Sequence, residues 1–117
     1  MFAGARKLDN LVVIVDNNGL QIDGDIADVC SPYPLADKFR AFNFNVVEID
    51  AHDFAQIDDA FAKAKETKGM PTAVIAKSVK GKGVSFMENQ ASWHGSAPNE
   101  EQYGQAIADL DKIGASL

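Results

Sequence analysis

The first segment that could do chemistry is a polar stretch that follows an apolar run, Asp16-Asn17-Asn18-Gly19-Leu20. Mg²⁺ takes oxygen ligands in octahedral geometry and usually keeps substrate phosphates among them. The side chain of Asn18 and the main-chain carbonyl of Leu20 could supply two such oxygens, since Gly19 between them favours a turn. Two neutral oxygens without a carboxylate bind Mg²⁺ weakly, and the same residue types also form ordinary turns. The stretch is therefore either a simple turn or part of a metal site.

A second polar segment, residues 78–98, carries a histidine and clustered lysines. His94 lies there in a Trp-His-Gly sequence. An imidazole can donate to a phosphate oxygen and move protons near neutral pH, so His94 is either a functional group or a bystander of the loop. Lys80 and Lys82 alternate with glycines, and we interpret them as solvated loop charges, with contact to phosphate as the alternative. His52, the other histidine, precedes an expected helix and is interpreted as a capping or solvent-exposed side chain.

Apolar runs predict the strands that would position these two segments. Residues 11–15 (LVVIV) are mostly β-branched, which is typical of a parallel strand buried on both faces. Residues 45–49 (NVVEI) and 72–77 (TAVIAK) predict further strands. The polar segments 16–33 and 78–98 each follow a strand, and ligands of open α/β sheets bind outside the carboxyl ends of the strands. We therefore expect both segments on one side of the domain.

Helical patterns fill the intervals between the strands. A helix is expected over residues 34–42, where Pro34 supplies a preset φ at the first turn. The two later helices begin with an Asp or Asn that is followed three residues on by Gln, as in a capping box. These cap pairs are Asp53 with Gln56 and Asn99 with Gln102. The expected apolar stripes are Phe54, Ile57, Phe61 and Ala64, and then Tyr103, Ala106, Ile107 and Leu110.

The order of elements, strand-helix-strand-helix-strand-loop-helix, predicts the fold class. It is an α/β fold: a parallel sheet of about three strands with right-handed crossovers and flanking helices. With 117 residues the chain suits one compact domain, 1–117.

Composition excludes several classes of function. The net charge of −6 argues against generic binding to nucleic acid or to an anionic membrane, since both require a basic face. No apolar run is long enough to span a bilayer, and the first residues lack the apolar stretch of a signal peptide. The single cysteine, Cys30, excludes an internal disulfide framework. These features predict a cytoplasmic protein.

Taken together, the motifs resemble transketolase, specifically its N-terminal section. The segments that carry the resemblance are KLDNLVVIVDNNGLQIDG, ADKFRAF, GMPTAVIAKSVKGKGVSFMEN and SWHGSAPNEEQY. They extend over essentially the whole chain. The resemblance implies the C-terminal half of a thiamine-diphosphate-binding domain, with thiamine diphosphate and Mg²⁺ as cofactors.

The resemblance also implies roles for individual residues. Asn18 matches the metal-binding Asn of the family, and Leu20 matches the residue whose main-chain carbonyl binds the metal. Gly19 belongs to the same cofactor-binding turn, and Ile22 matches an apolar residue near the cofactor. His94 matches a catalytic histidine that contacts the cofactor diphosphate and the sugar substrate near the reacting carbonyl.

The chain departs from the family pattern at the metal site. The family takes an Asp ligand from a Gly-Asp-Gly turn, and this chain contains no Gly-Asp-Gly. The resemblance implies that Met1 corresponds to a position inside the helix between the two metal-binding elements, and that the domain that binds the aminopyrimidine ring is absent. We therefore expect weak or no cofactor binding by this chain alone.

Two functions remain open after this departure. The chain is either part of a transketolase, which transfers a two-carbon ketol unit between sugar phosphates beside a complementary chain, or an inert self-associating domain. A deoxyxylulose-phosphate synthase-like enzyme is the alternative within the first class. Because strand 11–15 would lack a neighbour on one side, we expect a homo-oligomer formed through that exposed sheet edge. Sugar phosphates are expected to bind only in a completed site.

Overall fold

The computed structural model describes residues 1–116, whose contacts divide them into two compact units. The first unit contains residues 1–17 and 31–78, and the second contains residues 18–30 and 79–116. The interpretation of 1–117 as a single domain stays a prediction.

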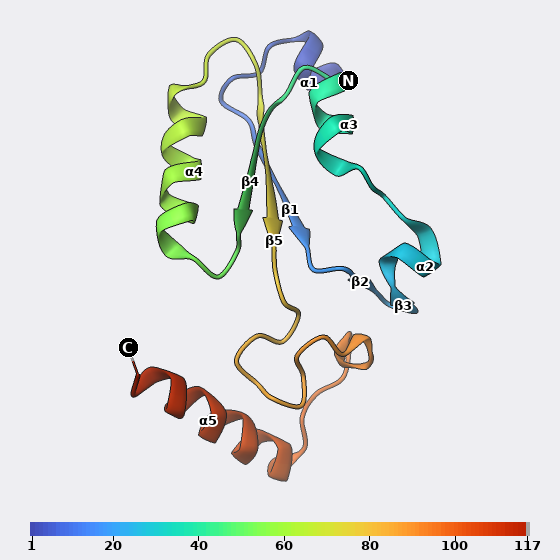
Figure 1. The fold of residues 1–117 in the computed structure, drawn as a ribbon, viewed down its shortest axis with the longest axis vertical. Helices are drawn as coiled ribbons and strands as arrows, with labels where there is room; N and C mark the ends of the chain where they lie inside the picture. The colour runs from blue at the N-terminus through green and yellow to red at the C-terminus, as the bar shows by residue number, and fades with distance from the viewer. Residues whose placement is uncertain (117) are drawn as a thin grey trace. The chain divides into compact units, whose positions relative to one another are not determined.

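A parallel sheet forms the centre of the first unit (Figure 1). Strand β5 (Thr72–Lys77) lies between β1 (Val12–Asn17) and β4 (Asn45–Asp50). It pairs in parallel with both neighbours along its whole length. The α/β class and the three-stranded parallel sheet predicted from the sequence are therefore confirmed.

Helices cover both sides of this sheet. Helix α4 (Phe54–Glu66) lies on one side, and α3 (Leu35–Ala41) lies on the other, as Figure 1 shows. The short helix α1 (Phe2–Ala5) precedes β1. This is the layer arrangement that parallel strands require, because each crossover helix must bury its apolar side against the sheet.

The core is centred on β5. The neighbouring residues Ala73 and Val74 point to opposite faces and are 0% and 3% exposed, so this strand is buried on both faces. The sequence predicted that property for residues 11–15 instead, and that interpretation is wrong: Ile14 in β1 is 58% exposed. Both strands are equally apolar in sequence, but only the central strand has a neighbour on each side.

The cap of α4 is present, with one difference in its partner. The Asp53 carboxylate accepts from the N–H groups of Ala55 (2.9 Å) and Gln56 (3.2 Å). The Gln56 side chain does not return to the Asp53 N–H as in a capping box. Its Oε1 accepts from the Asp50 N–H at 2.9 Å, and its Nε2 donates to Asp53 at 2.8 Å. The side-chain and then the backbone hydrogen bond from Gln56 lower the pKa of Asp53.

The buried face of α4 is built from small side chains. Ala60 and Ala64 are buried, whereas Phe54 is 87% exposed and Phe61 is also exposed. The apolar stripe predicted from the sequence is therefore wrong at both phenylalanines. Alanines at i and i+4 let the helix approach the sheet closely, and the larger side chains then lie beside the contact face.

The second unit contains short elements and one long helix. The stretch expected as a loop over 16–33 carries a small hairpin and a helix. The elements of the unit are β2 (Leu20–Gln21), β3 (Gly24–Asp25), α2 (Ile26–Cys30), the 3-10 turn η1 (Ala91–Trp93) and α5 (Glu100–Gly114).

Helix α5 begins with the predicted capping box. The Gln102 N–H donates to the Asn99 side chain and the Asn99 N–H donates to the Gln102 side chain, both at 2.9 Å. The expected apolar stripe is less buried than predicted: Tyr103 and Leu110 are exposed, and Ala106 is half-buried. Within residues 1–116, none of the helices has the length and apolar character needed to span a bilayer.

Replacing a central side chain tests this account of the core. We expect Ile75→Ala to lower the free energy of unfolding by about 2–5 kcal/mol, because it leaves a cavity on β5. The matched variant Ile14→Ala should cost less than about 1 kcal/mol, because that side chain is already largely in solvent. Urea unfolding followed by circular dichroism measures both values. Equal losses would contradict the assignment of β5 as the core strand.

Candidate functional site

The two polar segments meet at one small pocket of the second unit. Asn18, Leu20 and Gln21 line it from the first segment. Lys80, Ala91 and His94 line it from the second, around a volume of about 30 Å³. The expectation that both segments lie at the same place is therefore met inside this unit.

The first segment forms a hydrogen-bonded turn that orients Asn18. The Asn18 Oδ1 accepts from the Leu20 N–H at 2.9 Å. Gly19 has a φ of 75°, a backbone conformation that residues with a side chain rarely adopt. Its carbonyl accepts from the Ile26 N–H at 2.9 Å, and Leu20 pairs with Asp25 in the hairpin. The stretch is thus a turn, as one interpretation held, and the turn presents the amide at the pocket.

The Lys-Gly-Lys-Gly sequence forms a compact turn next to the pocket. Gly81 has φ of 72°, and a Cβ there would lie 2.7 Å from Met87, so only glycine fits. The Gly83 N–H donates to Glu88 Oε1 at 2.9 Å, and Lys82 forms an exposed ion pair with the same carboxylate at 3.7 Å. Lys80 is half-buried in the pocket wall. Its position in the wall favours the alternative that Lys80 contacts phosphate over the interpretation as a solvated loop charge.

His94 follows the turn η1. The His94 N–H donates to the carbonyl of Ala91 at 2.9 Å. The preceding Trp93 is anchored: its Nε1 donates to the Phe86 carbonyl at 3.1 Å, and the two rings lie 5.3 Å apart. The imidazole itself is exposed and lines the pocket. It is therefore accessible to a ligand while its backbone is fixed.

Helix α5 is bonded to the same loop. The Ser85 N–H and hydroxyl both donate to Asp109 Oδ2, at 3.0 and 2.6 Å. These two bonds, the hydroxyl bond first, lower the pKa of Asp109. Leu110 and Ile113 lie against Gly83, where a Cβ would meet them at 3.2 and 3.3 Å. The helix thus holds the loop that carries Lys80 and His94.

The donor set of the pocket suits phosphate oxygens better than a bare cation. The Lys80 ammonium and the His94 imidazole are hydrogen-bond donors to such oxygens, and Asn18 offers an amide. The residues that line the pocket include no carboxylate. Within residues 1–116 there is also no group of three His, Cys, Asp or Glu side chains placed to hold a metal ion. The donor types present therefore suit phosphate oxygens, while the volume of about 30 Å³ is close to that of a single water molecule.

The structure brings together some of the residues that the sequence singled out. Asn18, Leu20 and His94 line one pocket, and Gly19 shapes the turn between the first two. Ile22 does not reach the pocket: it lies at the tip of the β2–β3 hairpin and is 66% exposed.

Two lining residues were not identified as site residues from the sequence. Gln21 stands next to Leu20 in β2, and no motif marked it. Lys80 could have been found from its place shortly after a strand end, which is where ligands gather. His52 lies in the first unit, exposed before α4, where its N–H donates to Asp50 Oδ1 at 2.9 Å; it is not part of this pocket.

Sequence comparisons identify relatives along the whole chain. The family model described as transketolase, thiamine diphosphate binding domain, matches residues 1–111. The 6-deoxy-6-sulfo-D-fructose transketolase subunit of Clostridium sp. (strain MSTE9) is 41% identical over 115 residues, covering 98% of this chain and 42% of that protein. An apulose-4-phosphate transketolase subunit of Phocaeicola vulgatus is 39% identical over 112 residues, covering 96% of this chain and 40% of that protein. The chain thus spans about two fifths of these relatives.

Solved structures agree with these relatives. The transketolase of Campylobacter jejuni superposes with a TM-score of 0.87 at 32% identity, covering 94% of this chain and 17% of that one. A transketolase of Pichia stipitis superposes with a TM-score of 0.85 at 23% identity, covering 94% of this chain and 16% of that one, which shows the shared fold. These matches favour the transketolase resemblance over the deoxyxylulose-phosphate synthase alternative.

The bond between Ser85 and Asp109 gives a prediction with a defined sign. Ser85→Ala removes the hydroxyl donor, so the pKa of Asp109 should rise toward its ordinary value. A carboxyl with a lowered pKa stabilises the fold above its unfolded pKa, and this contribution is lost as the pH falls through the folded pKa. The difference in stability between wild type and variant should therefore be largest near neutral pH and shrink in acid.

Carboxyl-carbon NMR titration measures the pKa directly. Asp53 is the internal control, since its pKa is lowered by Gln56 and should not change in the Ser85→Ala variant. An unchanged Asp109 titration would show that Ser85 does not hold this carboxylate in solution.

Proposed function

The chain belongs to the transketolase thiamine diphosphate binding domain family, and we propose that it supplies the diphosphate side of a transketolase active site. The completed enzyme would transfer a two-carbon ketol unit between sugar phosphates. The observation that carries this proposal is the convergence of Asn18, Leu20, Lys80 and His94 on one pocket. Their combination of an amide oxygen, a cation and an imidazole is the chemistry that a magnesium diphosphate group requires.

Each residue has a proposed role in the completed site. Asn18 Oδ1 and the Leu20 carbonyl bind Mg²⁺, and Gly19 allows the turn between them. Lys80 and His94 donate hydrogen bonds to diphosphate oxygens. Bound thiamine diphosphate supplies the carbanion-stabilising chemistry of the reaction. The imidazole of His94 then donates or accepts a proton at a ring nitrogen close to the substrate carbonyl.

A complementary polypeptide would complete this site. The pocket lacks the carboxylate that would strengthen Mg²⁺ binding, and the chain spans about two fifths of its transketolase relatives. We infer that a second transketolase chain provides the Asp ligand and the aminopyrimidine-binding domain, and that Ile22 meets the cofactor only there. Sugar phosphates would bind in that assembly, and the site of action would be the cytoplasm.

The outer edge of β1 is the proposed place for added polypeptide. Strand β1 ends the sheet order, and Ile14 on it is exposed. An apolar edge strand is a template for pairing with another chain. The edge supports two occupants: a complementary transketolase chain, or a second copy of this chain. If only a second copy of this chain bound at the β1 edge, the protein would be an enzymatically inert domain that associates with itself.

Titration with thiamine diphosphate and Mg²⁺ tests the proposed pocket. We expect weak binding, with a Kd of about 1 mM or more. Amide shifts in NMR spectra should be confined to residues 18–21 and to the surroundings of Lys80 and His94. His94→Ala should reduce these shifts at least about threefold, because one donor to phosphate is lost.

The matched control is His52→Ala, which removes the other histidine and should leave the titration unchanged. Shifts that spread evenly over both units, or that do not depend on His94, would contradict the proposed diphosphate site.

Catalysis by the chain alone is a separate prediction. The purified polypeptide of residues 1–117 with thiamine diphosphate, Mg²⁺, a ketose phosphate and an aldose phosphate should form no product above a protein-free blank, because the residues that line the pocket include no carboxylate to complete the Mg²⁺ site. A coupled NADH assay measures this. Ketol transfer that scales with the amount of chain would overturn the proposal that a partner is required.

A further inference from the structure

One edge of β4 is open, and the hydrogen bonds of the strand show which groups it presents. The N–H groups of Asn45 and Ala51, at the two ends of the strand, donate toward the β5 side at 2.9 and 2.8 Å. Main-chain groups alternate in direction along a strand. The main-chain N–H and carbonyl groups of Val46, Glu48 and Asp50 therefore point away from the sheet.

Only part of this edge is covered. The Asp50 N–H donates to the Gln56 side chain at 2.9 Å. No hydrogen bond from elsewhere in residues 1–116 reaches the outward main-chain groups of Val46 or Glu48. Within residues 1–116, Val46 and Glu48 thus each present a main-chain N–H and a carbonyl without a hydrogen-bond partner, and the strand end beside them is capped by Gln56 at Asp50.

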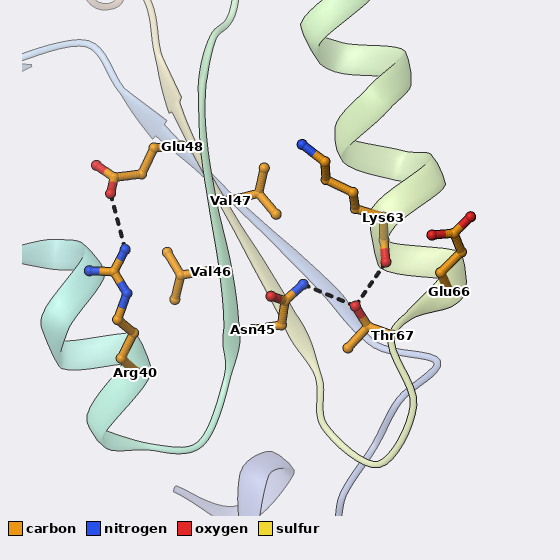
Figure 2. A pocket seen from close by; sticks show the side chains of 8 residues that line it. All are labelled: Arg40, Asn45, Val46, Val47, Glu48, Lys63, Glu66 and Thr67. Carbon is orange, nitrogen blue, oxygen red and sulfur yellow. Dashed lines mark hydrogen bonds and ion pairs between the residues drawn. The ribbon is translucent and has the colours of Figure 1, made fainter.

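A groove of about 590 Å³ runs along this open edge (Figure 2). Arg40 of α3 lies on one side of the strand, together with the side chains of Val46 and Glu48. Lys63 of α4 lies on the other side, where Val47 points. The helices therefore flank the edge and leave it accessible.

The charges of the groove are balanced, unlike those of the chain. The lining contains two cations, Arg40 and Lys63, and two carboxylates, Glu48 and Glu66, whereas the whole chain has a net charge of −6. Arg40 pairs with Glu48 at 3.3 Å. Lys63 forms no ion pair with any residue in the described range 1–116. Two copies of this groove carry no net charge, so they can approach without the repulsion that acts between surfaces with a net negative charge.

We propose that the β4 edge binds a second copy of this chain by antiparallel pairing about a two-fold axis at Val47. In this register Val46 stands opposite Glu48 of the other copy, and each exchanges its N–H and carbonyl with the other. The two-fold axis repeats the exchange, so the open groups of both strands are satisfied. Val47 meets Val47 of the other copy on the side of the strand where Lys63 lies. The inference does not depend on the transketolase function.

Disulfide trapping tests the register. Val47→Cys in a Cys30→Ser background should form a crosslinked dimer on mild oxidation, because a non-hydrogen-bonded antiparallel pair has Cα atoms about 4.5 Å apart. Glu48→Cys in the same background is the matched control and should stay uncrosslinked, since the two copies of that residue are diagonal at about 7–8 Å. Non-reducing gel electrophoresis gives the result. Crosslinking of both variants alike, or of neither, would overturn the register.

Proline variants separate this edge from the β1 edge. Val46→Pro removes an outward N–H and leaves the ladder with β5 intact. Ile14→Pro does the same on β1, because the Leu11 and Asn17 carbonyls accept from the β5 side and even-numbered residues point outward. In sedimentation, the Ile14→Pro variant should remain a dimer. The double variant Ile14→Pro/Val46→Pro should have a dimer Kd at least about tenfold higher than that of the Ile14→Pro variant. Circular dichroism checks that each variant is folded.

The outcomes distinguish the two edges. A folded Ile14→Pro variant that is monomeric would overturn pairing through β4. A folded Val46→Pro variant that is monomeric would instead count against self-association through β1 and would leave the β4 interface supported.

Discussion

The pairing of β5 with a strand on each side is the interaction on which the other features depend. It buries β5 and fixes the carboxyl ends of β1 and β5 next to each other. At these ends the Ser78 N–H donates to the Asn17 carbonyl at 3.4 Å, and the Ser78 hydroxyl donates to Asp16, 62 positions away in the sequence. The two polar segments therefore leave the sheet at adjacent points, which is the condition for their residues to form one pocket.

The pocket is held by local bonds as much as by the sheet. Gly19 and Gly81 adopt conformations that other residues rarely take, and Asn18 and Lys80, which precede them, line the pocket. Trp93 and the bond from Ser85 to α5 fix the loop that carries His94. This arrangement supplies donors for phosphate oxygens but no carboxylate for a cation. This division of chemistry is the basis of our proposal that a second polypeptide completes the site.

The same sheet leaves an open edge at each end, and the two edges differ. The β1 edge is apolar and carries an exposed Ile14, which suits a strand buried in a larger sheet. The β4 edge is flanked by charged helices and is capped at Asp50 by Gln56. The flanking charged side chains and the Gln56 cap at Asp50 leave only a short stretch of β4 open for pairing with another strand. The two edges therefore suit different partners, one for completing the fold and the other for joining equal copies.

The sequence by itself determined the three strands of the parallel sheet, the helices α3, α4 and α5, the cap residues Asp53 and Asn99, and the family, because these depend on short-range patterns and on motifs of fixed spacing. It also marked Asn18, Leu20 and His94, which carry the resemblance to transketolase. Only the tertiary structure decided which strand is central and which residues of the two segments meet. LVVIV and TAVIAK are alike in composition, but burial depends on neighbours that the local sequence does not contain. Lys80 likewise acquired its place in the pocket wall from a backbone turn around Gly81, not from its charge.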